Sequence, residues 1–214
     1  MAIRPMLVVD VEQVVRIHRA SFPGFFLTEL GPAFLRRFYR LLLESSVGVG
    51  VVAEQSGVLV GFAAGATRQE GLFRELLRRG VAGFAFDAFV YALRNPSATP
   101  RLLRALRRPR ESRESAAPAA LMSLAVAPEA QAGGTGLALV EAFCRGIASR
   151  GASKVCLTTD ADGNDRVNRF YARAGFVLIR TFVTPEGRRM NEYAKCLDPA
   201  VAVAGRAWER AGCS

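Results

Sequence analysis

The chain has 214 residues, 50% of them hydrophobic and 22% charged, a length that fits one domain and a composition that excludes an intrinsically disordered protein. The 4 cysteines show no Cys-x-x-Cys spacing and His18 is the single histidine, which argues against a structural zinc site and a disulfide scaffold. The formal charge of +10 attracts anions such as phosphates, nucleic acid or acidic lipid, although arginine enrichment with only two lysines, Lys154 and Lys195, is also typical of a compositional bias.

The N-terminal residues lack the apolar core of a signal peptide, so we expect a cytoplasmic protein. The longest nearly apolar run, residues 81–93, contains Asp87 and is too short to span a bilayer. Neither segment therefore predicts an integral membrane protein.

The first third of the chain predicts two helices and a β-hairpin. Apolar residues recur at helical spacing after Asp10, which we expect to cap the first helix, and Pro32 stands in the first turn of the second. Two runs rich in Val and Gly flank the polar turn Gln55-Ser56-Gly57. The expected elements are a strand at 6–9, a helix from 11 to the break at 22–24, a helix at 32–43, and strands at 47–54 and 58–66.

A basic segment follows the hairpin. Residues 71–93 have helical composition, residues 96–109 contain a basic helical stretch, and residues 111–118 read as a loop. Between Arg68 and Arg113 there are 11 arginines against four acidic residues, so most of the excess positive charge lies here.

The last part of the chain predicts a βαβ unit with a short crossover, followed by a helix and two strands. Gly175 is placed to end the later helix at its C′ position. A mixed sheet is therefore expected. The elements are a strand at 120–126, a glycine-rich turn, a helix to about 150, a strand at 154–159, a helix at 165–174, strands at 176–182 and 190–197, and a tail at 198–214.

The glycine-rich turn carries the chemistry. Free amides and the positive end of a helix dipole form an anion site, and the missing Cβ atoms of Gly133, Gly134 and Gly136 allow a pyrophosphate to approach closely. A tight connection without a ligand is the alternative reading of the glycines. No Lys-Ser/Thr pair follows them and Gly-x-Gly-x-x-Gly is not matched, which excludes a Walker A loop and a dinucleotide fingerprint.

The chain resembles the GNAT superfamily of acyl-CoA-dependent N-acyltransferases. Gln131-Ala132-Gly133-Gly134-Thr135-Gly136 fits its coenzyme A loop, Q/R-x-x-G-x-G/A, and Leu124-Ala125-Val126 fits its fourth strand. Asn164 with Phe170-Tyr171-Ala172-Arg173-Ala174-Gly175-Phe176 fits its N-x-x-A and F-Y-x-x-x-G-F block. The two motifs stand at the usual separation, which makes the resemblance specific over residues 5–66 and 119–197.

The resemblance implies an α/β (α+β) fold with a single mixed, mostly antiparallel central sheet flanked by helices. It implies a domain at 1–197, with a basic helical insertion at about 67–118 between the third and fourth strands, and a tail at 198–214. It also implies an N-acetyltransferase in which an amine attacks the thioester of acetyl-CoA directly, without a metal. The expected coenzyme A contacts are Leu124, Val126, Gln131, Ala132, Gly133, Gly134, Thr135, Gly136, Asn164 and Tyr171.

Individual roles follow from the same resemblance. The loop amides would hold the pyrophosphate, and the backbone of Leu124 and Val126 would pair with the pantetheine arm like an added strand. The Val126 N–H would face the developing oxyanion, Asn164 would hydrogen-bond the arm, and Tyr171 would protonate the departing thiolate. A core aromatic is the alternative reading of Tyr171.

Three positions depart from the family pattern. Gly133 stands where the loop is often basic, and Val167 replaces the small alanine after Asn164. Many members carry a basic carboxylate on the fourth or fifth strand, whereas the fourth strand here is Leu121-Met122-Ser123-Leu124. Glu54, Asp160, Glu192 or a water chain are the candidates for the proton acceptor. Surface carboxylates are the norm, so a solvated strand-end charge is the more usual reading of each of the three side chains.

Histidine ordinarily titrates near neutrality, which makes His18 a conceivable general base, but as a lone histidine on the first helix it is expected to be structural. Cys144 and Cys156 are expected to be small hydrophobes rather than nucleophiles. The first two helices contain several phenylalanines that fit either an apolar acceptor pocket or plain helix packing.

Two other function classes remain open at this point. The absent strand carboxylate is compatible with a coenzyme A-binding module without turnover. The other class is a basic nucleic-acid- or membrane-binding protein that uses residues 68–113, although no specific nucleic-acid motif accompanies them. The arginines and aromatics of this segment suit peripheral contact with an anionic membrane or an anionic substrate, and a solvated lid is the alternative reading. The acceptor amine is unidentified, and the protein is either a monomer or a homodimer.

Overall fold

The computed structural model describes residues 1–94, 119–131, 133–185 and 187–197. Its strands are β1 (Ala2–Pro5), β2 (Gly48–Gln55), β3 (Val58–Ala66), β4 (Ala119–Val126), β5 (Lys154–Asp160), β6 (Val177–Val183) and β7 (Arg189–Cys196). Its helices are α1 (Val11–Ser21), α2 (Phe26–Glu29), α3 (Pro32–Glu44), α4 (Gln69–Arg94), α6 (Thr135–Ser149) and α7 (Asp165–Arg173), with 3₁₀ turns η1 (Val8–Asp10) and η4 (Pro128–Ala130).

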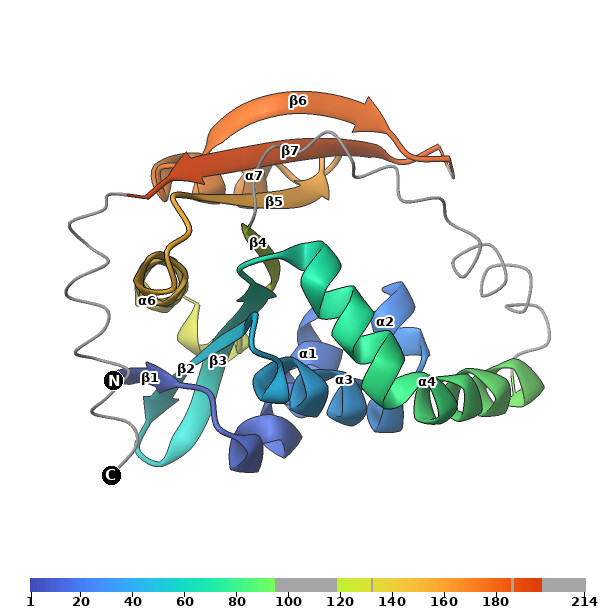
Figure 1. Ribbon diagram of the computed structural model, residues 1–214. Helices are drawn as coiled ribbons and strands as arrows, with labels where there is room; N and C mark the ends of the chain where they lie inside the picture. Colours follow the sequence, from blue (N-terminus) through green and yellow to red (C-terminus); the bar gives the residue numbers. More distant parts are fainter. Residues whose placement is uncertain (95–118, 132, 186, 198–214) are drawn as a thin grey trace.

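The strands form one sheet in the order β1-β2-β3-β4-β5-β7-β6 (Figure 1). Each neighbouring pair is antiparallel except β4 and β5, which are parallel and joined through α6. This confirms the predicted mixed, mostly antiparallel sheet flanked by helices and the βαβ unit within it.

Two hydrophobic cores lie on opposite faces of the sheet. On one face α6 packs on the strands through Leu139, Phe143 and Ile147. On the other face α1 and α3 pack through residues such as Val14, Leu35 and Leu42, which recur at helical spacing in the sequence. The helices predicted from periodicity therefore lie where their apolar faces require.

The expected strand at residues 6–9 is wrong. The first strand ends at Pro5, and the apolar residues that follow enter the 3₁₀ turn η1, where Val9 is 81% exposed. Asp10 does precede α1, but its carboxylate accepts hydrogen bonds from the Leu7 N–H and from Arg4 instead of capping α1. The sequence of a short apolar run without alternation is compatible with a strand and also with a turn that buries one side chain. In this turn the buried side chain is that of Met6.

The other predicted elements are found within a few residues of their expected bounds, and α2 was not predicted. The described residues of the basic segment form α4, which packs along α3 with Gly83 lying against the Arg37 guanidinium and Asp87 paired to Arg37. The predictions for residues 96–109, 111–118 and 198–214 lie outside the described residues.

Candidate active site

An opening separates β4 from β5. The two parallel strands pair only at Ala119 with Val155 and at Ala120 with Cys156, and from there to their C-terminal ends they carry no mutual pairing. On its other side β4 stays paired with β3 as far as Val126. The strand edge between Leu121 and Val126 therefore faces a gap in the middle of the sheet.

The backbone groups that face this gap follow from the β3–β4 ladder. The Ala127 N–H donates to the Val60 carbonyl, so Ala127 points toward β3. Backbone groups alternate between the two sides of a strand, so the N–H and C=O groups of Val126 and Leu124 point toward the gap. These are the two residues whose backbone the sequence analysis expected to bind a ligand.

A β-bulge near Met122 bends β4 beside the gap. Ala64 pairs with Ser123 whereas Gly65 pairs with Leu121, which leaves Met122 as the extra residue. Bulges bend a strand and increase its twist, and they are common next to active sites. The bulge therefore helps β4 to diverge from β5.

The glycine-rich turn ends at the N-terminus of α6. Gly134 has φ +76° and its carbonyl accepts the Ala138 N–H, so the amides of Thr135, Gly136 and Leu137 point out of the helix end. A Cβ atom on Gly134 would meet nothing within 4 Å, whereas Gly136 packs closely on the Phe170 ring. The turn thus presents free amides on an open surface, the geometry of an anion site.

Gln131 holds the turn in place. Its Nε2 donates to the Val126 carbonyl at 3.2 Å, and its Oε1 accepts from Arg166 of α7 at 3.3 Å. Arg166 thereby brings a cation to a loop that has glycine at position 133. Sequence reasoning missed Arg166, because only the packing of α7 beside the loop places it there.

Asn164 and Asn168 fasten the start of α7 to β5. The Asn164 amide nitrogen donates to Thr159 Oγ1 at 2.7 Å and to the Asp160 carbonyl at 3.2 Å. Asn168, which sequence reasoning missed, donates to that same carbonyl, and its Oδ1 accepts from Asn191 and from the Tyr193 hydroxyl. Asn164 Oδ1 is the atom of that side chain left for a ligand.

Tyr171 lies on the α6 face of the gap. It packs, with Leu124 and Val126, against the core beneath α6, and its ring meets Phe170, Phe176 and Tyr193 at centroid distances of 5.2, 5.8 and 6.3 Å. Burial raises the pKa of its phenol to about 12. Its hydroxyl makes no hydrogen bond to any described residue, so a protonated donor stands beside the gap.

The three candidate carboxylates lie in different surroundings. Glu54 is two strands away from β4 and pairs with Arg4. Asp160 ends β5, and both of its oxygens accept from Arg188, whose guanidinium also lies 5.8 Å from the centre of the Phe25 ring. Glu192 lies on β7 opposite Thr158 and pairs with Arg180.

His18 is buried against Phe22, Phe62 and Tyr39, and its Nδ1 lies 2.7 Å from the Tyr39 hydroxyl. Burial lowers its pKa to about 4, so the ring is neutral at pH 7. Burial also raises the pKa of Cys144 to about 11. These environments agree with the structural roles predicted for the two side chains.

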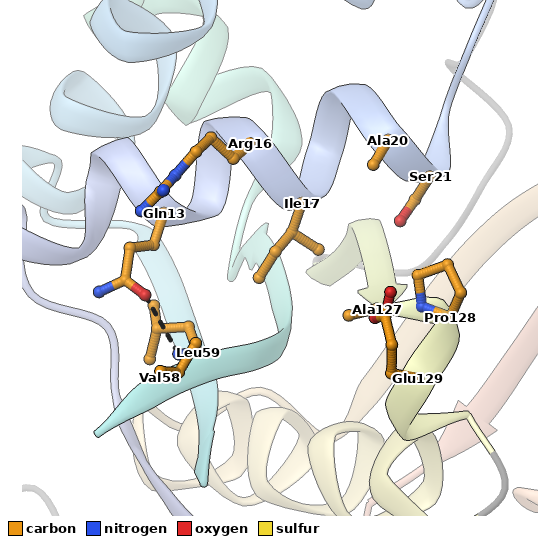
Figure 2. A pocket seen from close by; sticks show the side chains of 10 residues that line it. All are labelled: Gln13, Arg16, Ile17, Ala20, Ser21, Val58, Leu59, Ala127, Pro128 and Glu129. Carbon is orange, nitrogen blue, oxygen red and sulfur yellow. Dashed lines mark hydrogen bonds between the residues drawn. The ribbon is translucent and has the colours of Figure 1, made fainter. Parts of the chain in front are cut away.

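A shallow hollow of about 280 Å³ lies on the α1 face beside the end of β4 (Figure 2). Ile17 and Ser21 of α1 face Ala127 and Pro128 across it, and the Ser21 hydroxyl is buried without a partner among the described residues. Val58 and Leu59 of β3 also line the hollow and no β5 residue is among its lining, so it lies on the β3 side of β4, away from the gap.

Within the described residues no three His, Cys, Asp or Glu side chains are grouped to hold a metal ion. No helix in that part of the chain is both long and apolar enough to cross a bilayer.

The model of the acetyltransferase (GNAT) family matches residues 11–176, more than half of the chain. No curated protein matches the sequence.

Several solved structures share the fold. Ard1 from Thermoplasma volcanium is 20% identical, with a TM-score of 0.58 over 92% of this chain and 97% of its own. Ribosomal-protein-alanine N-acetyltransferase from Brucella melitensis is 16% identical, with a TM-score of 0.59 over 92% of this chain and 100% of its own. An aminoglycoside 6'-N-acetyltransferase complexed with coenzyme A is 15% identical, with a TM-score of 0.59 over 93% of this chain and 98% of its own.

Proposed function

The chain belongs to the GNAT acetyltransferase family, and we propose that it moves an acetyl group from acetyl-CoA directly to a primary amine within a ternary complex. The observation that carries this proposal is the gap between β4 and β5, with the free amides of the glycine-rich turn at one end. An extended arm pairs with a free strand edge through main-chain hydrogen bonds. A pyrophosphate fits the open helix N-terminus.

The residues present fit coenzyme A. The amides of residues 133–136 would hold the pyrophosphate, whereas the Gln131 N–H already donates to the Pro128 carbonyl and Ala132 lies outside the described residues. Arg166, which donates to Gln131 Oε1, would add a positive charge beside this loop. The Val126 and Leu124 backbone would pair with the pantetheine arm, and Asn164 would accept a hydrogen bond from it through Oδ1. When bound, acetyl-CoA supplies an acetyl group as an activated thioester.

Val126 and Tyr171 have separate tasks in this mechanism. The Val126 N–H stabilises negative charge as it develops on the carbonyl oxygen, which is the function of an oxyanion-hole donor. Tyr171 donates its proton to the departing sulfur, and its raised pKa of about 12 keeps it protonated over the whole neutral range. The support for these roles is that Val126 ends the unpaired edge of β4 and that Tyr171 packs against the same core as Leu124 and Val126.

Calorimetric titration with acetyl-CoA and with coenzyme A tests the donor site, and thiol release with a panel of primary amines tests the transfer. We expect saturable binding of both ligands by the wild-type protein and thiol release that requires an amine. Wild-type protein that is folded by circular dichroism but binds neither ligand would contradict the proposal. Binding without thiol release from any amine would instead favour a coenzyme A-binding module.

We further propose that residues 67–118 are an insertion in the family fold and that this segment contacts an anionic surface or substrate. The support is the described part of α4, which exposes Arg78, Arg79 and, at 64%, Phe86. Basic and aromatic side chains together favour anionic lipid surfaces. Vesicles containing phosphatidylglycerol should retain the protein at low salt and release it at high salt, whereas neutral vesicles should not retain it.

A further inference from the structure

We propose that Glu192 is the catalytic base of this enzyme, an inference that rests on the proposed function. In a direct transfer the attacking amine must lose a proton on the side from which it arrives. Tyr171 occupies the α6 face of the gap, so the proton acceptor is expected on the opposite face. The described strands place one buried carboxylate there.

Glu192 lies beside the part of β5 that has left β4. It pairs with Thr158, two residues beyond the last contact of β5 with β4 at Cys156. Its neighbours Asn191 and Tyr193 point toward α7, because both contact Asn168. Successive side chains on a strand alternate between faces, so Glu192 points to the α1 face.

The environment of Glu192 leaves one oxygen available. The side chain is 6% exposed, and Oε2 accepts from Arg180 Nε at 2.6 Å. Oε1 accepts no hydrogen bond from the described residues, and it is not one of the enclosed atoms without a partner. Glu192 is therefore held in position through one oxygen while the other can be reached.

The other candidates lack this arrangement. Both oxygens of Asp160 are engaged by Arg188 in a bidentate pair. Glu54 is bound to Arg4 beyond β3. The two further buried carboxylates, Asp10 and Asp87, are paired with arginines away from the gap.

The reaction balances with these two side chains. Oε1 of Glu192 takes the proton that the amine loses as the nitrogen–carbon bond forms. The carbon–sulfur bond breaks with its electron pair on sulfur, which takes the Tyr171 proton. Exchange with water then removes the proton from Glu192 and returns one to Tyr171.

The test compares Glu192→Gln with Asp162→Asn, since Asp162 is also a carboxylate paired with an arginine but is 63% exposed at the side chain. The probe is the primary amine that gives the wild-type protein its fastest thiol release. We expect kcat to fall about 100-fold or more in Glu192→Gln, as for loss of a general base, and to change less than two-fold in Asp162→Asn. Affinity for acetyl-CoA by calorimetry should be unchanged in both.

Two further readouts separate a base from a structural ion pair. Formate should restore thiol release to Glu192→Ala but not to Tyr171→Phe. Calorimetric affinity of the probe amine for the coenzyme A complex should weaken in Glu192→Gln. Unchanged kcat in Glu192→Gln, or Glu192→Ala that is folded and not rescued by formate, would overturn the assignment. Failure of the proposed function would instead be seen in the wild-type protein, as absent acetyl-CoA binding.

Discussion

At the scale of single residues, His18 links stability to pH. Its pKa is lowered to about 4 by burial against Phe22, Phe62 and Tyr39, while an unfolded chain leaves a histidine near 6.5. Between these two pH values His18 is therefore protonated in the unfolded state and neutral in the folded state. This difference costs stability progressively as pH falls from about 6.5 to 4, by about 3 kcal/mol in full.

Urea unfolding at pH 7, 6, 5 and 4.5 measures this loss. The free energy of unfolding of His18→Phe should fall less steeply between pH 6.5 and 4.5 than that of the wild-type protein. The other titrating groups are common to both proteins, so the difference between the two curves reports His18. Tyr39→Phe removes the 2.7 Å contact but keeps the imidazole, so it should be less stable at pH 7 and retain most of the steep decline. Parallel curves for wild-type protein and His18→Phe would exclude the linkage.

Tyr171 should affect the rate without affecting donor binding. Tyr171→Phe removes a hydroxyl that makes no hydrogen bond to described residues, so we expect the fold to persist while kcat falls about 100-fold. Tyr193→Phe is the control, because it also removes a phenolic hydroxyl from the same core, 6.3 Å away between ring centres, and in addition loses the hydrogen bond to Asn168. Thiol-release kinetics with a fixed amine compare the two. Equal losses would indicate a packing effect instead of acid catalysis.

At the scale of elements, substitutions of Gly134 at the N-terminus of α6 should affect coenzyme A binding and protein stability differently. Gly134 has φ +76°, so Gly134→Ala should lower the free energy of unfolding by about 1 kcal/mol. Asp tolerates this conformation better and is favoured at an N-cap, so Gly134→Asp should be nearly as stable as the wild-type protein. Its negative charge nevertheless opposes a pyrophosphate at the same amides.

Calorimetry should therefore show acetyl-CoA affinity reduced at least 10-fold in Gly134→Asp, while urea unfolding shows little change. Gly151→Asp is the control, because Gly151 also has positive φ, +85°, and a Cβ there would meet nothing within 4 Å, but it lies just beyond the opposite end of α6. Wild-type affinity in Gly134→Asp would rule out a phosphate site at this helix end.

The elements with strong local signals were predictable from sequence. Apolar periodicity located α1 and α3, and the polar turn between two valine-rich runs located the β2–β3 hairpin, whose Ser56 and Gly57 both have positive φ. The first strand was misplaced because β1 is only four residues long and is recognised by pairing with β2, 50 residues later. Short edge strands depend on such partners more than on their own sequence.

The candidate site was predictable as far as its backbone. Glycine spacing and the strand before it identified the loop and the two residues of β4 whose amides face the gap. Other contacts join segments that are 25 or more residues apart. Arg166 donates to Gln131, and Arg188 contacts both Asp160 and the Phe25 ring. No local pattern encodes such contacts, so the side chains that complete the site required the structure.

At the scale of the whole molecule, a ligand in the gap should stabilise the entire fold. The gap is bordered by β4, β5, the N-terminus of α6 and α7, so a ligand bound there would connect elements from separate parts of the chain. A ligand that binds only the folded state raises the free energy of unfolding by about 2.7 kcal/mol at a concentration 100 times its Kd. Coenzyme A is a polyanion and the chain carries +10, so added salt should reduce this gain by screening.

Urea unfolding with and without coenzyme A, at about 50 mM and about 500 mM salt, measures both effects. We expect a clear stabilisation at low salt, a smaller one at high salt, and almost none in Gly134→Asp at either. Because dilution into salt also weakens any exposed ion pair, each comparison is made against the same protein without ligand at the same salt concentration. A gain that is equal at both salt concentrations would mean that the arm pairing along β4, and not the phosphates at α6, dominates binding.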